Sequence, residues 1–198
     1  MQIEKLVMKT ETVFSEDRTH RYLLRKEWDA KKKKAVVIMT NPSTASLLTM
    51  DYTTMYILNN LGKLDFGSVD IVNIVSKMTK KLSIKEDADS PEHERENFGF
   101  ITNAAQKADV VIVAWGKIGE NNKAVRDVQD RLLEHLKPFQ NKFCMIAGEK
   151  GGDNFHPLAP QIRFSWILQK YEHKQNAQEQ KQVGGKASET ALKNEKQH

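Results

Sequence analysis

The stretch AVVIMTNPST, residues 35–44, decides the fold prediction. Its first half is an unbroken apolar run rich in β-branched residues, which predicts a strand buried on both faces, as in a parallel sheet covered by helices. The run stops at Asn41-Pro42-Ser43-Thr44, where an amide, an imide ring and two hydroxyls follow. Ligands of open α/β sheets bind beyond the carboxyl ends of the strands, so this end is a candidate binding site.

The rest of the chain alternates between strand and helix patterns. Short apolar or β-branched runs predict strands over 69–75, 109–116 and 142–148, and helical spacing predicts helices over 51–64, 90–107 and 121–136. Residues 20–29 predict a further strand, joined through the lysine-rich turn at 31–34 to residues 35–39 as an antiparallel hairpin. The predicted fold class is α/β, a central, mostly parallel sheet with helices on both faces and an N-terminal antiparallel hairpin. The strand order is left open.

Composition bounds the domain organisation. The chain has 198 residues and a formal net charge of +5, enough for one domain over 1–173 with a substantial core. Residues 174–198 have no aromatic side chain and few large apolar ones, which predicts a disordered polar tail. No apolar run reaches the roughly 20 residues that cross a bilayer. With a single cysteine, Cys144, no disulfide framework is expected, so we expect a soluble, cytoplasmic protein without membrane contact.

Several function classes lack their signatures in this sequence. Neither a phosphate-binding P-loop nor the glycine fingerprint of a dinucleotide fold is present. His93 and His135 have no partner at metal-ligand spacing, and Cys144 lies within an apolar run, which disfavours a cysteine nucleophile. We therefore expect no metal and no cofactor.

Polar or small residues follow four of the predicted strands. If these strands are parallel, their carboxyl ends meet at one edge of the sheet. Each feature also has an ordinary structural explanation, because Asn-Pro-Ser forms turns, tryptophan fills cores and loop histidines are commonly exposed. The candidates are Asn41 to Thr44, Asn73, Trp115 with Gly116, and His156 in the loop 148–160.

Five separated motifs, in order, resemble the bacterial and phage family called domain of unknown function 1643. The resemblance covers about residues 20–160 and rests on NPSTA, DIVNIV, ENFGFI, VVIVAWGKIG and HPL, with DYTT after the first of them. The family name implies no activity.

The layout is also similar to the uracil-DNA glycosylase superfamily, with a strand ending in Asn-Pro and a late His-Pro loop. This resemblance implies that Asn41 positions an attacking water and that His156 hydrogen-bonds the base oxygen on which negative charge develops. Asn73 would read the base edge, and Tyr52 or Trp115 would stack on the base. Pro42, Ser43, Thr44 and Gly116 would complete the ligand site. Thr40 and Ser43 depart from the glycines that usually flank Asn-Pro in those enzymes.

Two functions from different classes remain open. The first is hydrolysis of an N-glycosidic bond without a metal. The second is non-catalytic binding of a nucleotide-derived small molecule, as in a phage counter-defence decoy. In that case a homo-oligomer that completes the site is an open alternative. The expected partner is a nucleotide or nucleobase-containing ligand, and DNA has weaker support because no dense basic channel is evident. A scaffold with partner-facing helices ranks last, since core packing explains the apolar helix faces.

Overall fold

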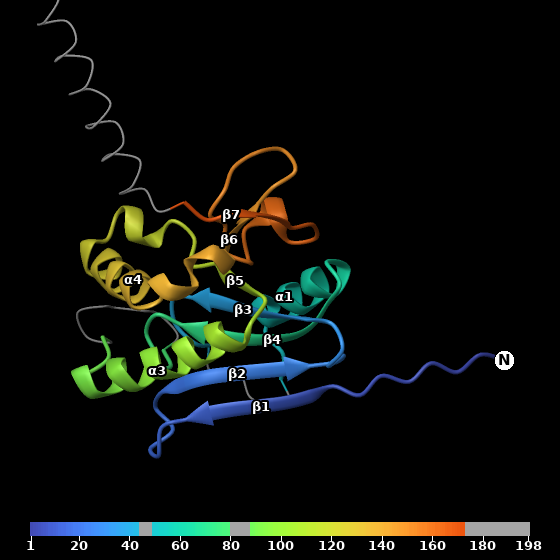
Figure 1. Cartoon of the computed structure of the whole chain (residues 1–198), viewed down its shortest axis with the longest axis horizontal. Coiled ribbons are helices and arrows are strands. Elements are labelled where there is room, and N and C mark those ends of the chain that lie inside the picture. Colours follow the sequence, from blue (N-terminus) through green and yellow to red (C-terminus); the bar gives the residue numbers. More distant parts are fainter. Residues whose placement is uncertain (44–48, 80–87, 173–198) are drawn as a thin grey trace, which may run out of the picture.

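The computed structural model describes residues 1–43, 49–79 and 88–172 and contains one seven-stranded sheet (Figure 1). The strands lie in the order β1-β2-β4-β3-β5-β6-β7. Their bounds are β1 Lys9–Phe14, β2 Arg21–Glu27, β3 Lys33–Met39, β4 Phe66–Asn73, β5 Val110–Val113, β6 Phe143–Ala147 and β7 Ile167–Lys170. The α/β prediction is confirmed at this level.

The sheet is mixed rather than mostly parallel. Strand β3 pairs in parallel with β4 and β5, and β5 pairs in parallel with β6. The pairs β1/β2, β2/β4 and β6/β7 are antiparallel. The sequence missed β1 and β7, because both are largely exposed edge strands without an apolar run.

The predicted hairpin between residues 20–29 and 35–39 is wrong. Strand β4 lies between β2 and β3, and the N-terminal antiparallel hairpin is instead formed by β1 and β2. The backbone N–H groups of Trp28 and Asp29 both donate to the Gly67 carbonyl, at 2.9 Å each. These bonds hold the chain against β4 as it leaves β2, so β3 enters the sheet on the far side of β4.

Within the described residues, α-helices cover both faces of the sheet, close to the predicted bounds (Figure 1). They are α1 Tyr52–Lys63, α3 Pro91–Lys107 and α4 Lys123–His135, with short 3-10 turns at Ile118–Glu120, Lys137–Lys142 and Pro160–Ile162. Asp51 caps α1 by accepting the Thr54 N–H, and Ser90 caps α3 by accepting the His93 N–H. Both predicted helix starts are therefore confirmed.

Strand β3 divides the core, because its side chains alternate between the two faces. Val36 and Ile38 pack with α3 and α4 in one apolar cluster. Ala35, Val37 and Met39 pack with α1 in the other. All five residues of this run are at most 6% exposed, as the continuous apolar pattern predicted.

The parallel strands end at one edge of the sheet. Met39 on β3 pairs with Asn73 on β4, Ile38 with Val113 on β5, and Val113 with Met145 on β6. Because β2 runs antiparallel to β4, the beginning of β2 lies at this same edge. We call this edge, with the loops that follow the strands, the carboxyl-end rim. The chain leaves β3 toward β4 on one side and β5 lies on the other, so β3 and β5 flank a topological switch point.

Two sequence predictions concern residues outside the described ranges, namely the polar tail at 174–198 and the ligand role of Thr44. Over the part of the chain that is described, no helix combines the length and the apolar character needed to span a bilayer.

Candidate functional site

Asn41 begins the site where β3 ends. Its side chain is half-buried, and its Nδ2 donates to the Thr79 carbonyl at 3.3 Å and to the Pro42 carbonyl at 3.5 Å. The amide thus ties the end of β3 to the segment after β4. Pro42 is buried, and half-buried Ser43 hydrogen-bonds the Asp51 carboxylate at the start of α1.

His156 reaches the rim from the loop after β6. Its half-buried side chain loses solvation, which lowers its pKa and favours the neutral ring. The Leu158 N–H donates to His156 Nδ1 at 3.2 Å. In the neutral ring Nδ1 is therefore the acceptor and Nε2 carries the proton. The loop beside Gly116 therefore carries an uncharged N–H donor.

Gly116 is the point where this loop meets β5. Its φ is +67°, and a side-chain Cβ there would lie 3.2 Å from the Cβ of His156. Asn154 Nδ2 donates to the Gly116 carbonyl at 3.1 Å. The loop is therefore fixed against the end of β5 by close backbone approach and a hydrogen bond.

The two predicted stacking residues lie in opposite environments. Trp115 is 4% exposed and packs edge-to-face on Tyr171, with ring centroids 6.4 Å apart. Tyr52, the first residue of α1, is 73% exposed. Of these two residues, only Tyr52 offers an accessible aromatic face.

Asp51 links the histidine side of the rim to Arg21 at the start of β2. Burial acts to raise the pKa of Asp51, but hydrogen bonds from Ser43 and Thr54 lower it overall and keep the carboxylate ionised. Its charge acts on both Arg21 and His156. The backbone N–H of Arg21 donates to the Ser76 carbonyl at 2.8 Å, which places this arginine at the rim.

Unpaired buried polar atoms gather at the rim. Native structures leave few buried polar atoms without partners, and such atoms call for a functional or solvent-mediated explanation. Eight buried side-chain atoms within the described ranges have no hydrogen-bond partner, and five of them belong to residues at or beside the rim: Arg21 Nε, Asn73 Oδ1, Thr79 Oγ1, Asn97 Oδ1 and Asn154 Oδ1. The other three are Asn60 Oδ1 on α1, Gln129 Nε2 on α4 and Trp166 Nε1 before β7. Asn97 touches the same edge because its Nδ2 donates to the Asn73 carbonyl at 2.9 Å.

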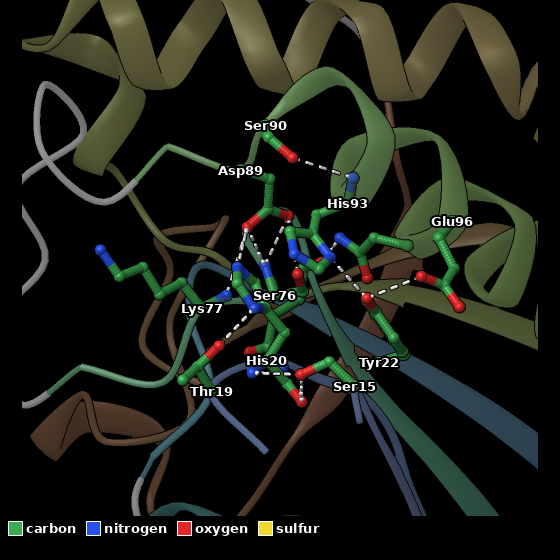
Figure 2. A network of polar contacts seen from close by, with 12 residues as sticks. Ser15, Thr19, His20, Tyr22, Ser76, Lys77, Asp89, Ser90, His93 and Glu96 are labelled. Atoms are coloured by element: carbon green, nitrogen blue, oxygen red, sulfur yellow. Dashed lines mark hydrogen bonds and ion pairs between the residues drawn. The ribbon is translucent and has the colours of Figure 1, made fainter. Parts of the chain in front are cut away.

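A polar network on the α3 side of the sheet involves both sequence neighbours of Arg21, His20 and Tyr22, and Figure 2 shows their side chains with Asp89 and His93. The Asp89 carboxylate accepts the backbone N–H of Ser76 at 2.8 Å and its hydroxyl at 2.9 Å, and it also accepts the Lys77 N–H. His20 Nε2 lies 3.8 Å from Asp89 Oδ1. His20, the residue before Arg21, is therefore held by Asp89 close to Ser76, and the Ser76 carbonyl accepts the Arg21 N–H.

The network continues through the ring of His93 and the hydroxyl of Tyr22. The His20 and His93 rings stack with centroids 3.8 Å apart, and the Tyr22 hydroxyl donates to Glu96 Oε2 at 2.8 Å. The same hydroxyl lies 2.7 Å from His93 Nδ1. These contacts from α3 hold the residues on either side of Arg21, so its backbone position is well determined.

We expect the His20 network to make stability depend on pH. Burial, followed by the His93 charge, lowers the pKa of His20 below its value of about 6.5 in an unfolded chain. The unfolded chain then binds more protons, so this contribution is complete above about pH 6.5 and is lost as the pH falls through the lower folded value. Urea unfolding at pH 7.5 and 5.5 should show a smaller acid loss for His20→Gln than for wild type. The exposed-site control His135→Gln should lose as much stability as wild type. An equally large loss in His20→Gln would contradict the expectation.

Part of the site has no recognisable signal in the sequence. Arg21 was hidden inside a strand pattern, because its place at the rim depends on β2 pairing with β4. Asp51 stands at the start of a predicted helix and carries no further signal in the sequence, and Thr79 and Asn154 have no distinguishing pattern. The structure brings Asn41, Asn73, Gly116 and His156 to one rim, as expected from parallel strand ends. Over the described residues, no group of three or more His, Cys, Asp or Glu side chains is arranged to hold a metal ion.

A family model described as "Protein of unknown function (DUF1643)" matches residues 21–158. No curated protein and no solved structure matches the chain. The resemblance to uracil-DNA glycosylases therefore stays a prediction.

Proposed function

Because the chain belongs to the DUF1643 family, whose description carries no activity, we propose a function from the rim itself: it binds a nucleobase-containing ligand. The observation that carries this proposal is the cluster of buried, unpaired polar atoms at the carboxyl ends of the parallel strands. A ligand with several neutral hydrogen-bonding groups would satisfy them together.

The polar atoms at the rim suit the edge of a base. Asn73 Oδ1 and Asn154 Oδ1 are acceptors, the Thr79 hydroxyl is a donor and an acceptor, and His156 Nε2 is a donor. Proteins that take up a single base read the donors and acceptors of its edge and stack on its face. Tyr52 is available for stacking.

The same groups could act in hydrolysis of an N-glycosidic bond. A water oxygen bonds to the anomeric carbon, the carbon–nitrogen bond breaks, and the base leaves with the bonding electrons and takes up the proton released from the water. His156 Nε2–H would stabilise the negative charge developing on the base, as a preorganised donor does. Asn41 Oδ1 would orient the water, and ionised Asp51 would stabilise positive charge on the sugar.

Non-catalytic binding is the second candidate, and one observation favours it. Asn41 Nδ2 is already committed to the Thr79 and Pro42 carbonyls, so only one end of this amide is available to a water. A protein that sequesters a nucleotide needs the base-reading atoms but no attacking water. A phage decoy for nucleotide signals, with or without a homo-oligomer, would work in this way.

One experiment separates the two candidates. The purified protein is incubated with a panel of nucleosides and nucleoside monophosphates, and mass spectrometry identifies both the molecules retained by the protein and those in solution. We expect retention of one ligand class by wild type and a loss on the order of a hundredfold in His156→Ala, because a donor to the base is removed. Asn41→Ala should impair release of free base more than retention.

Matched controls make the result specific. His135→Ala alters a histidine at the end of α4 and should leave retention unchanged. Intact ligand recovered from wild type favours sequestration, and free base in solution favours hydrolysis. Equal retention by wild type and His156→Ala, or no retention of any panel member, contradicts the proposed function.

A further inference from the structure

We propose that Arg21 binds a phosphate group of the ligand, so the ligand class is a phosphorylated nucleoside rather than a free base or nucleoside. The inference rests on the proposed function of the rim and names its substrate class more closely. It starts from an arginine whose charge has no direct partner among the described residues.

Within the described residues, Arg21 is a buried cation without a directly paired anion, which is unusual in stable proteins. The residue is 4% exposed, and its Nε has no hydrogen-bond partner in the described part of the chain. Burial lowers its pKa, which shows the energetic cost of keeping the guanidinium charged there. A buried charge is normally paired and hydrogen-bonded, because desolvation otherwise destabilises the folded protein.

Asp51 attracts the Arg21 charge electrostatically but does not form a hydrogen bond with it. Its carboxylate acts electrostatically on Arg21, yet the two side chains form no ion pair within 4.0 Å among the described contacts. The Asp51 oxygens instead bind the Thr54 N–H and Ser43. The planar guanidinium therefore keeps donors for another acceptor.

A phosphate fits these donors better than a neutral group does. Guanidinium and phosphate form paired, charge-assisted hydrogen bonds, which are shorter and stronger than neutral ones. Two other arginines, Arg25 on β2 and Arg131 on α4, are already paired with carboxylates. Arg25 binds Asp70 at 2.7 Å, and Arg131 binds Glu94 at 2.6 Å.

The strand order places this cation at the correct end of the rim. Arg21 is on β2, Asn73 ends β4, Asn41 follows β3, and Gly116 with His156 lies beyond β5. Three strand spacings separate β2 from β5, about 14 Å at about 4.8 Å each. The rim thus offers neutral base-reading groups from β4 to the loop beyond β5 and a cation at its β2 side, matching a base and a phosphate joined by a sugar.

The test compares each nucleoside with its own 5′-monophosphate by isothermal titration. We expect wild type to bind the monophosphate roughly 30-fold tighter or more, because losing one partner of a buried charge pair has effects of this size. In Arg21→Met this preference should disappear, so that a nucleoside and its monophosphate bind with equal affinity. Arg21→Lys, which keeps the charge but not the fork, should retain only part of it. Arg95→Met, at an exposed position on α3, should behave as wild type.

A second measurement guards against a folding artefact. Arg21→Met removes an uncompensated buried charge and replaces it with an apolar chain of similar length, so its unliganded Tm should equal or exceed that of wild type. A clearly lower Tm would mean that Arg21 is a structural counter-charge for Asp51, which overturns the inference.

The remaining outcomes separate the inference from the proposed function. Equal affinity of wild type for nucleoside and monophosphate overturns the phosphate role but leaves base binding intact. No binding of either overturns both. A short single-stranded oligonucleotide, with and without a 5′-phosphate, identifies the source of the phosphate. Arg21-dependent binding of only the 5′-phosphorylated strand indicates a terminal monoester, and equal Arg21-dependent binding of both strands indicates the backbone.

Discussion

Replacing Asp70 with Ala should lower the free energy of unfolding by about 2–3 kcal/mol, because it removes a buried carboxylate that accepts charge-assisted hydrogen bonds from two half-buried cations. Asp70 lies on β4 and is fully buried. Its carboxylate accepts Arg25 Nε at 2.7 Å and Nη2 at 3.0 Å, and Lys34 Nζ lies 2.8 Å from Oδ2. Removing it leaves two cations, from the strands on either side of β4, without their shared partner.

The size of this effect follows from the position of the cluster. The hydrogen bond with Asp70 is the largest influence that raises the pKa of Arg25. The cluster joins β2, β4 and β3, and β4 separates the two other strands in the sheet. Loss of the carboxylate therefore weakens the junction between the antiparallel edge and the parallel strands.

Urea unfolding followed by circular dichroism measures the change. Glu11→Ala is the matched control, because Glu11 binds the same Arg25 at 3.0 Å from an exposed position on β1. An exposed pair contributes about 0–1 kcal/mol, so this variant should remain close to wild type. If Asp70→Ala loses no more stability than Glu11→Ala, the buried cluster does not stabilise the sheet junction.

The sequence predicted those elements whose pattern depends on burial alone. The apolar runs at β3, β5 and β6 and the capped helices α1 and α3 were correct because each buries a continuous face or fixes its own first turn. The hairpin failed because strand pairing is a long-range property. Local alternation in residues 20–29 cannot distinguish β3 from β4 as the neighbour of β2.

The same distinction separates the predicted from the missed site residues. Asn41, Gly116 and His156 follow strand ends or lie in the last loop, so position in the chain was enough to find them. Arg21 precedes its strand's apolar residues and reaches the rim only because β2 runs antiparallel to β4. A buried arginine in a strand pattern is a usable signal, but only once that pairing is known.

Gly116→Val should remove ligand retention as completely as His156→Ala and also destabilise the fold. The φ of +67° is strained for any side chain and most of all for a β-branched one, which has a cost of roughly 1–3 kcal/mol. The added Cβ would also lie 3.2 Å from His156 Cβ and 3.4 Å from its backbone nitrogen. The valine methyl groups extend further, so the loop carrying Asn154 and His156 must move.

Gly116→Val keeps the His156 imidazole, so the expected loss of retention arises because the imidazole is displaced. A shift of about 1 Å in a group that positions a ligand can reduce activity about a hundredfold. Gly62→Val is the matched control, because a Cβ at Gly62 on α1 meets nothing within 4 Å and its φ is not positive. That variant should keep wild-type retention. Calorimetry of the two variants with the ligand panel checks the expectation, and full retention by Gly116→Val would show that the close approach of the loop to β5 does not set the geometry of His156.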